Sequence, residues 1–130
     1  MRGSIRSLLV VGALSALSAP AFAVDPGNVE AGEDVFKKCR ACHEAGPDAK
    51  NKVGPALTGV VGRKVGSVPD FAYSDANKSF GEKGAVWSEA ELFKYLENPL
   101  TYMPKTKMAF AGLKDEQDRA DVIAYLKQFK

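Results

Sequence analysis

The chain of 130 residues has 45% apolar and 26% charged residues, which is the composition of one small globular domain and too little material for two. Its formal charge of +2 comes from Arg2 and Arg6, since the rest of the chain has 16 basic and 16 acidic residues. Without a basic excess, no binding of nucleic acid is expected.

The first predicted element is an export signal over residues 1–23. Two arginines precede the uncharged run SLLVVGALSALSAPAFA, and residues 21–23 give the small-x-small pattern that signal peptidase accepts. A retained membrane anchor is the alternative, but the run is short and interrupted by glycine, serine and proline. We expect cleavage after Ala23, one domain over residues 24–130, and a soluble protein in the periplasm.

The second element is a helix predicted by NVEAGEDVFKKC, residues 28–39. Val29, Val35 and Phe36 recur at helical spacing. Acidic residues come early in the segment and lysines late, which the helix dipole favours. The helix therefore leads directly into the cysteine motif that follows.

CRACH, residues 39–43, contains both cysteines and the only histidine of the chain. A disulfide between Cys39 and Cys42 would close a tiny loop and stabilise little. A thioredoxin-like redox pair would need a strand before it and a helix after it, and a zinc site would need a fourth ligand that no further Cys or His supplies. In a c-type haem site, both thiols add to the haem vinyl groups and His43 ligates the iron.

Residues 44–87 are rich in glycine and proline and show no strand alternation, so we predict a long loop. A loop of this length is unusual in a compact domain unless a cofactor fills the core. A bound haem would do so, which favours the haem interpretation of residues 39–43.

Two further helices are predicted near the end of the chain. SEAELFKYLENP begins with Ser88 and Glu91 in capping-box register and ends before Pro99. DEQDRADVIAYLKQF, residues 115–129, has acids in its first turn and an apolar stripe after them. The expected fold class is therefore all-α.

The second axial position on the iron needs a ligand other than histidine, because His43 has no second histidine to pair with. Met103 and Met108 are the candidates. Filling gaps in an apolar core is the commoner role of methionine. Met108 lies in PKTKMAFAG, a segment without helical periodicity that could cover a haem face, and we expect it to be the ligand.

The mature chain resembles the class I cytochromes c, both the soluble periplasmic carriers of bacteria and mitochondrial cytochrome c. The matching segments occur in family order: GEDVFKKCRACH, VGPALTGVVGRKVG, FAYSDANKSF, AVWSEAELFKYLENP, TKMAFAG and DVIAYLKQF. The resemblance implies a class I cytochrome c fold, with three to five helices and long loops wrapped around one covalently attached haem.

The resemblance also implies the site residues. Cys39 and Cys42 would form thioethers to haem c, His43 and Met108 would be the axial iron ligands, and the Pro55 carbonyl would accept the other N–H of the histidine. The expected haem environment further comprises Arg63, Tyr73 and Trp87 around a buried propionate, Asn77, Tyr95 and Thr106 around an internal water on the methionine side, and Phe110 beside the exposed haem edge.

The implied function is one-electron transport between membrane respiratory or photosynthetic complexes, such as a cytochrome bc complex, and an oxidase or reaction centre. The chain would be a monomer and not an enzyme. An open sixth site would instead indicate a haem enzyme or gas sensor, and free thiols a dithiol oxidoreductase. Transient docking is expected through lysines that surround the haem edge, namely Lys37, Lys38, Lys50, Lys52, Lys105, Lys107 and Lys114.

Overall fold

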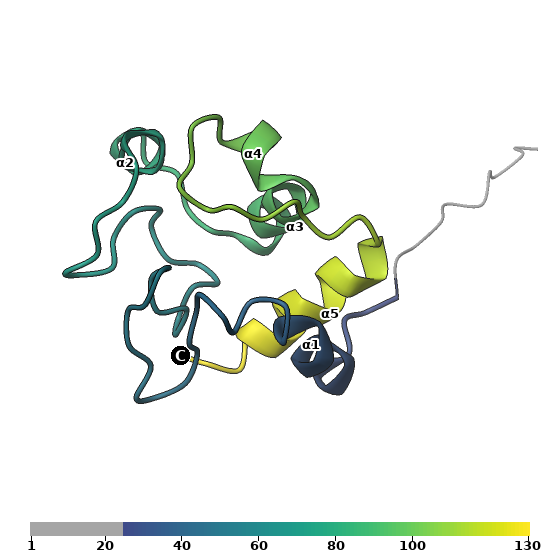
Figure 1. Ribbon diagram of the computed structural model, residues 1–130. Coiled ribbons are helices and arrows are strands. Elements are labelled where there is room, and N and C mark those ends of the chain that lie inside the picture. Colours follow the sequence, from purple (N-terminus) through teal and green to yellow (C-terminus); the bar gives the residue numbers. More distant parts are fainter. Residues whose placement is uncertain (1–24) are drawn as a thin grey trace, which may run out of the picture.

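The computed structural model describes residues 25–130, and the predicted signal over residues 1–23 lies outside this range. The described part has five helices (Figure 1) and no strand, only one isolated bridge between Lys64 and Val86. None of these helices is long and apolar enough to cross a membrane. The all-α prediction is confirmed, and the helices are α1 (Val29–Phe36), α2 (Asp75–Glu82), α3 (Glu89–Glu97), α4 (Pro99–Tyr102) and α5 (Glu116–Leu126).

The three predicted helices begin at capping side chains. Asn28 accepts a hydrogen bond from the Ala31 amide at the start of α1, and Ser88 accepts one from the Glu91 amide at the start of α3. Asp115 accepts two backbone hydrogen bonds at the start of α5. Each bond satisfies an amide that the first helical turn leaves without a partner. The Glu91 side chain does not complete the capping box, because it bonds Tyr102 instead.

The expectation of loop throughout residues 44–87 is wrong for α2. Ser74 caps this helix by accepting a hydrogen bond from the Asn77 amide at 3.1 Å, and Asp75 lies in the first turn. Most of its residues are polar, and Ala76 and Phe80 are too few apolar positions for the helix to be recognised by periodicity. The short α4 was also missed, although Asn98 caps it and Pro99 occupies its first turn.

Helices α1 and α5 cross closely and join the two ends of the described chain (Figure 1). At Gly32 the backbones approach so nearly that an added Cβ would lie 2.0 Å from the Asp121 carbonyl oxygen. The Asp121 carboxylate is buried and accepts hydrogen bonds from the Asn28 amide at 2.8 Å and from Gln117 Nε2 at 2.9 Å. The start of α1 is thereby fixed to α5.

The remaining core lies around α3 and the segments on either side of it. Trp87, Tyr95 and Met103 are buried there, and Met103 has no exposed surface at all. Arg119 on α5 is also buried, donates hydrogen bonds to the Leu113 and Lys114 carbonyls, and stacks on the ring of Phe93 at 4.4 Å. These contacts connect α5 to the half of the molecule that contains the candidate methionine.

Candidate functional site

The cysteine motif forms tight turns directly after α1. The amides of Cys42 and His43 both donate to the Cys39 carbonyl, at 3.1 and 2.9 Å. These bonds fold residues 39–43 into a tight turn. The two thiols and the imidazole therefore all come from one five-residue segment. Both cysteines are free thiols and half-buried.

The surroundings of the cysteines argue against the two competing interpretations. Burial raises the pKa of the Cys39 thiol, whereas a catalytic dithiol needs a lowered thiol pKa. No strand precedes the motif among residues 25–130. In the same range, no three His, Cys, Asp or Glu side chains lie close enough to hold a metal ion, so the ligand set of a zinc site is missing.

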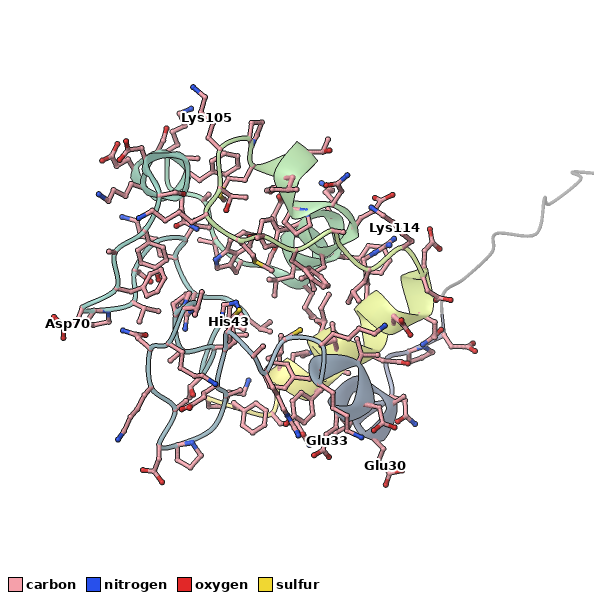
Figure 2. All side chains as sticks on the ribbon, viewed as in Figure 1. Glu30, Glu33, His43, Asp70, Lys105 and Lys114 are labelled. Carbon is pink, nitrogen blue, oxygen red and sulfur yellow. The ribbon has the colours of Figure 1, made fainter. Side chains whose placement is uncertain are left out.

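His43 is buried and held in one orientation near the centre of the molecule (Figure 2). Its Nδ1 donates to the Pro55 carbonyl oxygen at 2.7 Å, which leaves Nε2 without a proton and able to bind iron. Burial lowers the pKa of His43, so its ring is neutral at pH 7. Gly54 permits the close packing, since an added Cβ would lie 2.3 Å from the histidine Cε1. Sequence reasoning missed this role of Gly54, although its place beside Pro55 was a signal.

The two methionines have different surroundings. Met103 is completely buried within the hydrophobic core, where it fills space. Met108 is half-buried in an irregular segment, and its Sδ accepts a hydrogen bond from Tyr95 Oη at 3.1 Å. The Met108 amide donates to Thr106 Oγ1 at 3.3 Å. Tyr95 and Thr106 therefore both form hydrogen bonds with Met108.

Few interactions hold residues 104–107, the segment before Met108, in place. Lys105 has φ of +68°, a left-handed conformation that costs a side-chain-bearing residue about 1–2 kcal/mol. Lys107 Nζ donates to the Ala72 carbonyl at 3.1 Å and ties the segment to the start of α2. The bond from Lys107 was not foreseen, because no local pattern relates residues so far apart in the sequence.

Arg63 is the cationic group of the predicted propionate environment. Its Nη1 donates to the carbonyls of Ala56 and Thr58, at 3.1 and 2.9 Å, while its Nε is buried without a partner. Tyr73 Oη accepts from the Val68 amide, so its own proton is free for donation. A half-buried cation with an unused N–H favours an anionic partner that a bound group would supply.

The remaining residues of the predicted haem environment are Asn77, Trp87 and Phe110. Asn77 lies on α2 with its Oδ1 buried and unpartnered. Trp87 packs against Tyr95, with 4.7 Å between ring centroids, and Phe110 is half-buried against the core. The Trp87 amide donates to the Arg63 carbonyl oxygen at 2.8 Å, so Trp87 lies directly beside Arg63 in the structure.

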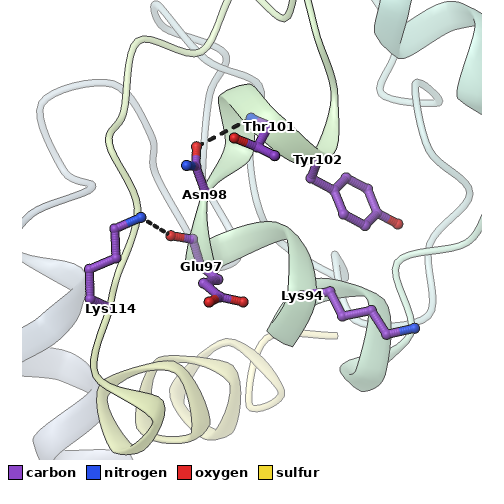
Figure 3. A pocket seen from close by; sticks show the side chains of 6 residues that line it. All are labelled: Lys94, Glu97, Asn98, Thr101, Tyr102 and Lys114. Carbon is purple, nitrogen blue, oxygen red and sulfur yellow. Dashed lines mark hydrogen bonds between the residues drawn. The ribbon is translucent and has the colours of Figure 1, made fainter.

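The structure has two surface hollows, and Tyr73 and Lys107 line the second of them. The hollow between α3 and Lys114 has a volume of about 390 Å³ (Figure 3), and a second of about 640 Å³ lies between the start of α2 and the methionine segment. Neither is lined by the cysteines, His43 or Met108. The first is lined by Lys94, Glu97, Asn98, Thr101, Tyr102 and Lys114.

Comparison with known proteins identifies the family. The family model described as cytochrome c matches residues 29–130. The chain belongs to the cytochrome c family. It is 54% identical to cytochrome c2 of Rhodomicrobium vannielii over 119 residues, which cover 92% of this chain and 91% of that protein. It is 56% identical over 103 residues to cytochrome c of Dictyostelium discoideum, covering 78% and 91% of the two chains.

A solved structure supports the same conclusion. Cytochrome c2 from Rhodospirillum centenum superimposes with a TM-score of 0.76 at 48% identity, covering 80% of this chain and 99% of that chain. The predicted class I cytochrome c fold is confirmed. As a member of the family, the chain is a one-electron carrier that binds haem c covalently, with Cys39 and Cys42 at the two cysteine positions of the motif.

The residues present fit such a group. His43 has an unprotonated Nε2 that can bind iron. Met108 has a thioether sulfur that contacts the neutral hydroxyl of Tyr95. The unpartnered Arg63 Nε and the free Tyr73 proton suit a carboxylate. Haem c combines an iron, two vinyl attachment points and carboxylates, so its chemistry matches this set of donors.

The Tyr102–Glu91 pair, which the sequence did not reveal, makes a prediction about pH. Tyr102 Oη donates to a Glu91 carboxylate oxygen. Burial, together with Glu91, raises the pKa of Tyr102 from 10.0 to about 12, and the bond from Tyr102 lowers the pKa of Glu91 from 4.5. The stability gained through Tyr102 is thus present below pH 10 and lost as the pH rises through about 12. The stability gained through Glu91 is present above pH 4.5 and is lost as the pH falls below this value.

We therefore expect Tyr102→Phe to lower the free energy of unfolding most between pH 5 and 10. Denaturant unfolding of both proteins across this range and beyond it measures the difference. Tyr125→Phe is the control for loss of a phenolic hydroxyl, because the Tyr125 ring packs between Phe36 and Phe129 and the bond to Glu91 comes from Tyr102. A difference for Tyr102→Phe that is constant from acid to alkaline pH would contradict the interpretation.

Proposed function

We propose that His43 and Met108 are the axial iron ligands of a soluble carrier that shuttles electrons between membrane complexes. The proposal rests chiefly on the hydrogen bond from Tyr95 Oη to Met108 Sδ, at 3.1 Å. This bond orients one sulfur lone pair toward Tyr95 and leaves another for a metal. With Met103 occupied in the core, Met108 is the thioether that remains for coordination.

Bound haem c supplies an iron that alternates between ferrous and ferric states. The chain's own groups decide which state is favoured. The Pro55 carbonyl holds the His43 ring fixed, so the imidazole need not reorient when the charge changes. A Met108 thioether is a weak donor, and buried apolar surroundings penalise positive charge, so both raise the reduction potential.

Two occupied axial positions would leave no coordination site for oxygen or another substrate. We therefore propose that the chain carries electrons and is not an enzyme or a gas sensor. Arg63 and Tyr73 would bind the inner propionate, Trp87 would contribute its indole N–H, and Asn77 would help Tyr95 and Thr106 to order an internal water. Phe110 would border the exposed haem edge.

Partners would dock through the lysines around that edge. Lys37 and Lys38 precede the cysteines, and their ion pairs with Asp34 and Asp118 are exposed and therefore weak. Val53 is 79% exposed between Lys52 and Gly54 and offers an apolar contact within this basic surface. Figure 2 places Lys105 and the acidic Glu30 and Glu33 at opposite ends of the molecule. The full docking set is Lys37, Lys38, Lys50, Lys52, Lys105, Lys107 and Lys114.

This charge separation predicts a salt dependence. We expect the rate of oxidation by a membrane partner to fall as salt is added, because screening weakens steering. Lys50→Glu and Lys105→Glu should lower the rate at low salt by about tenfold and flatten the salt dependence. Lys127→Glu is a matched control at the end of α5, beside Glu89. Rates that do not respond to salt, or that fall equally in all three variants, would contradict the docking surface.

We also propose that residues 1–23 are a cleaved signal, that residues 24–130 form the mature domain, and that the mature protein is a periplasmic monomer. The export machinery of bacteria delivers chains to the compartment in which haem c is attached. The similarity to proteins named cytochrome c2 is compatible with either a photosynthetic or a respiratory partner for this chain.

One experiment tests the proposed carrier function. The chain is expressed with a haem c maturation system, and its mass and its ferric and ferrous spectra are recorded with and without carbon monoxide. A mass increased by one haem, sharp reduced bands and no rapid carbon monoxide binding are expected. A five-coordinate haem that readily binds carbon monoxide would overturn the proposal.

A further inference from the structure

The side chain of Asn51 connects two loop segments that are distant in the sequence. Its Nδ2 donates a hydrogen bond to the Pro69 carbonyl oxygen at 3.0 Å, and its Oδ1 accepts one from the Ala56 amide at 2.9 Å. In the part of the chain that the structure describes, the bond to Pro69 is the single hydrogen bond between residues 66–71 and residues 44–60. The half-buried amide of Asn51 therefore sets how these two segments lie against each other.

One end of this bridge leads to Arg63. Ala56, whose amide donates to Asn51, uses its carbonyl oxygen to accept a hydrogen bond from Arg63 Nη1 at 3.1 Å. Nη1 also donates to the Thr58 carbonyl, at 2.9 Å. The two carbonyls fix the plane of the guanidinium, while Nε is buried with no partner. The position of this unpaired donor thus depends on the segment that Asn51 holds.

The other end of the bridge leads to Tyr73. The Val68 amide donates to Tyr73 Oη at 3.0 Å, and Pro69 directly follows Val68. Asp70, the next residue, has φ of +59°, which is unfavourable for a residue with a side chain, and it lies exposed at the outer edge of the molecule (Figure 2). A strained turn keeps one conformation only where its surroundings hold it. Asn51 provides such a contact from the neighbouring segment.

Arg63 and Tyr73 lie close enough to influence one another. Burial lowers the pKa of Arg63, and the Tyr73 hydroxyl partly offsets this by raising it. Both side chains are half-buried, and each keeps a hydrogen for donation, on Arg63 Nε and on Tyr73 Oη. Two such donors suit one shared carboxylate. Their spacing is set by the two segments, which Asn51 joins.

We propose that Asn51 is a positioning residue that holds Arg63 and Tyr73 at the spacing needed to bind one carboxylate of attached haem c. It acts through Ala56 and Pro69 and not through a contact of its own with the carboxylate. The inference rests on the proposed function, because haem c supplies that carboxylate. Donors that neutralise part of its negative charge make ferric iron less favourable, so the bridge raises the reduction potential.

The test compares Asn51→Ala with Asn98→Ala in the haem-loaded protein. Asn98 also accepts a hydrogen bond from a backbone amide, that of Thr101 at 3.2 Å, but it caps α4 and has no bond to either segment. The reduction potential of Asn51→Ala should fall below that of the wild type, whereas Asn98→Ala should keep the wild-type value. Exchange of the Val68 amide, followed by NMR on the ferrous protein, should be at least about tenfold faster in Asn51→Ala alone.

A double-mutant cycle separates positioning from a general loss of stability. In an Arg63→Ala background, Asn51→Ala should shift the potential by less than about half as much, because one of the two donors that it positions is gone. An equal shift in both backgrounds, or unchanged exchange of the Val68 amide in Asn51→Ala, would overturn the inference.

Should Asn51→Ala fail to fold, Asn51→Asp takes its place, since a carboxylate still accepts from Ala56 but cannot donate to Pro69. Faster exchange of the Val68 amide is expected in this variant too, and wild-type exchange would contradict the role of Asn51. The ferric spectrum of each protein reports methionine ligation separately. A wild type without that ligation refutes the proposed function, whereas normal ligation with unchanged potential and exchange in Asn51→Ala refutes only the positioning role.

Discussion

Replacing Met108 by alanine should open the sixth coordination position and lower the reduction potential by on the order of 0.2 V, a fraction of the range that axial ligands span. The thioether is the donor that favours ferrous iron, and an alanine leaves Tyr95 Oη without the sulfur it now contacts. Redox titration measures the potential. Carbon monoxide binding to the ferrous protein and the long-wavelength ferric band of methionine ligation report the open position.

Met103→Leu is the matched control for this experiment. Met103 has no exposed surface, so its truncation to alanine would cost about 2–5 kcal/mol and confuse ligation with unfolding. Leucine conserves volume and should cost less than about 1.5 kcal/mol. Loss of the ferric band in Met103→Leu together with its survival in Met108→Ala would reverse the proposed assignment of the two methionines.

Replacing Gly32 by alanine should destabilise the protein by at least about 3 kcal/mol, although alanine is the better helix former by about 1 kcal/mol. An added Cβ would lie 2.0 Å from the Asp121 carbonyl oxygen, and backbone cannot yield as a flexible side chain can. Helices α1 and α5 would have to separate, which also disturbs the bond between Asn28 and Asp121. The midpoint of denaturant unfolding measures the loss.

Glu30→Ala provides the comparison on the same helix. Glu30 is exposed on α1, so its removal should change the free energy of unfolding by no more than about 0.5 kcal/mol. Equal stability of Gly32→Ala and Glu30→Ala would show that the helices can separate at little cost. That result would contradict the close approach described for Gly32.

Patterns confined to a few neighbouring residues were the most predictable features. The Cys39–His43 motif and the helix start at Ser88 each depend on a short segment of the sequence. Helix α2 escaped prediction because Ala76 and Phe80 are its only apolar residues, and its main signal was the cap at Ser74.

Features that need distant backbone could not be derived from sequence. The closeness of Gly32 to α5 depends on how two helices cross, and the Lys107 bond to Ala72 depends on where two loops meet. Glu91 has the capping-box spacing from Ser88, so the sequence predicted that its carboxylate would bond the backbone at the start of α3. In the structure it accepts a hydrogen bond from Tyr102. Tertiary structure gave that carboxylate a different partner.

The crossing of α1 with α5 implies that the two sides of the haem site differ in their resistance to local opening. His43 follows α1 within a few residues, and α1 packs closely against α5, so we expect amide exchange on this side to require nearly global unfolding. Met108 lies in irregular backbone tied by the Lys107 bond and bent through the left-handed Lys105. Its segment can open as a separate, less stable unit while the histidine side stays folded.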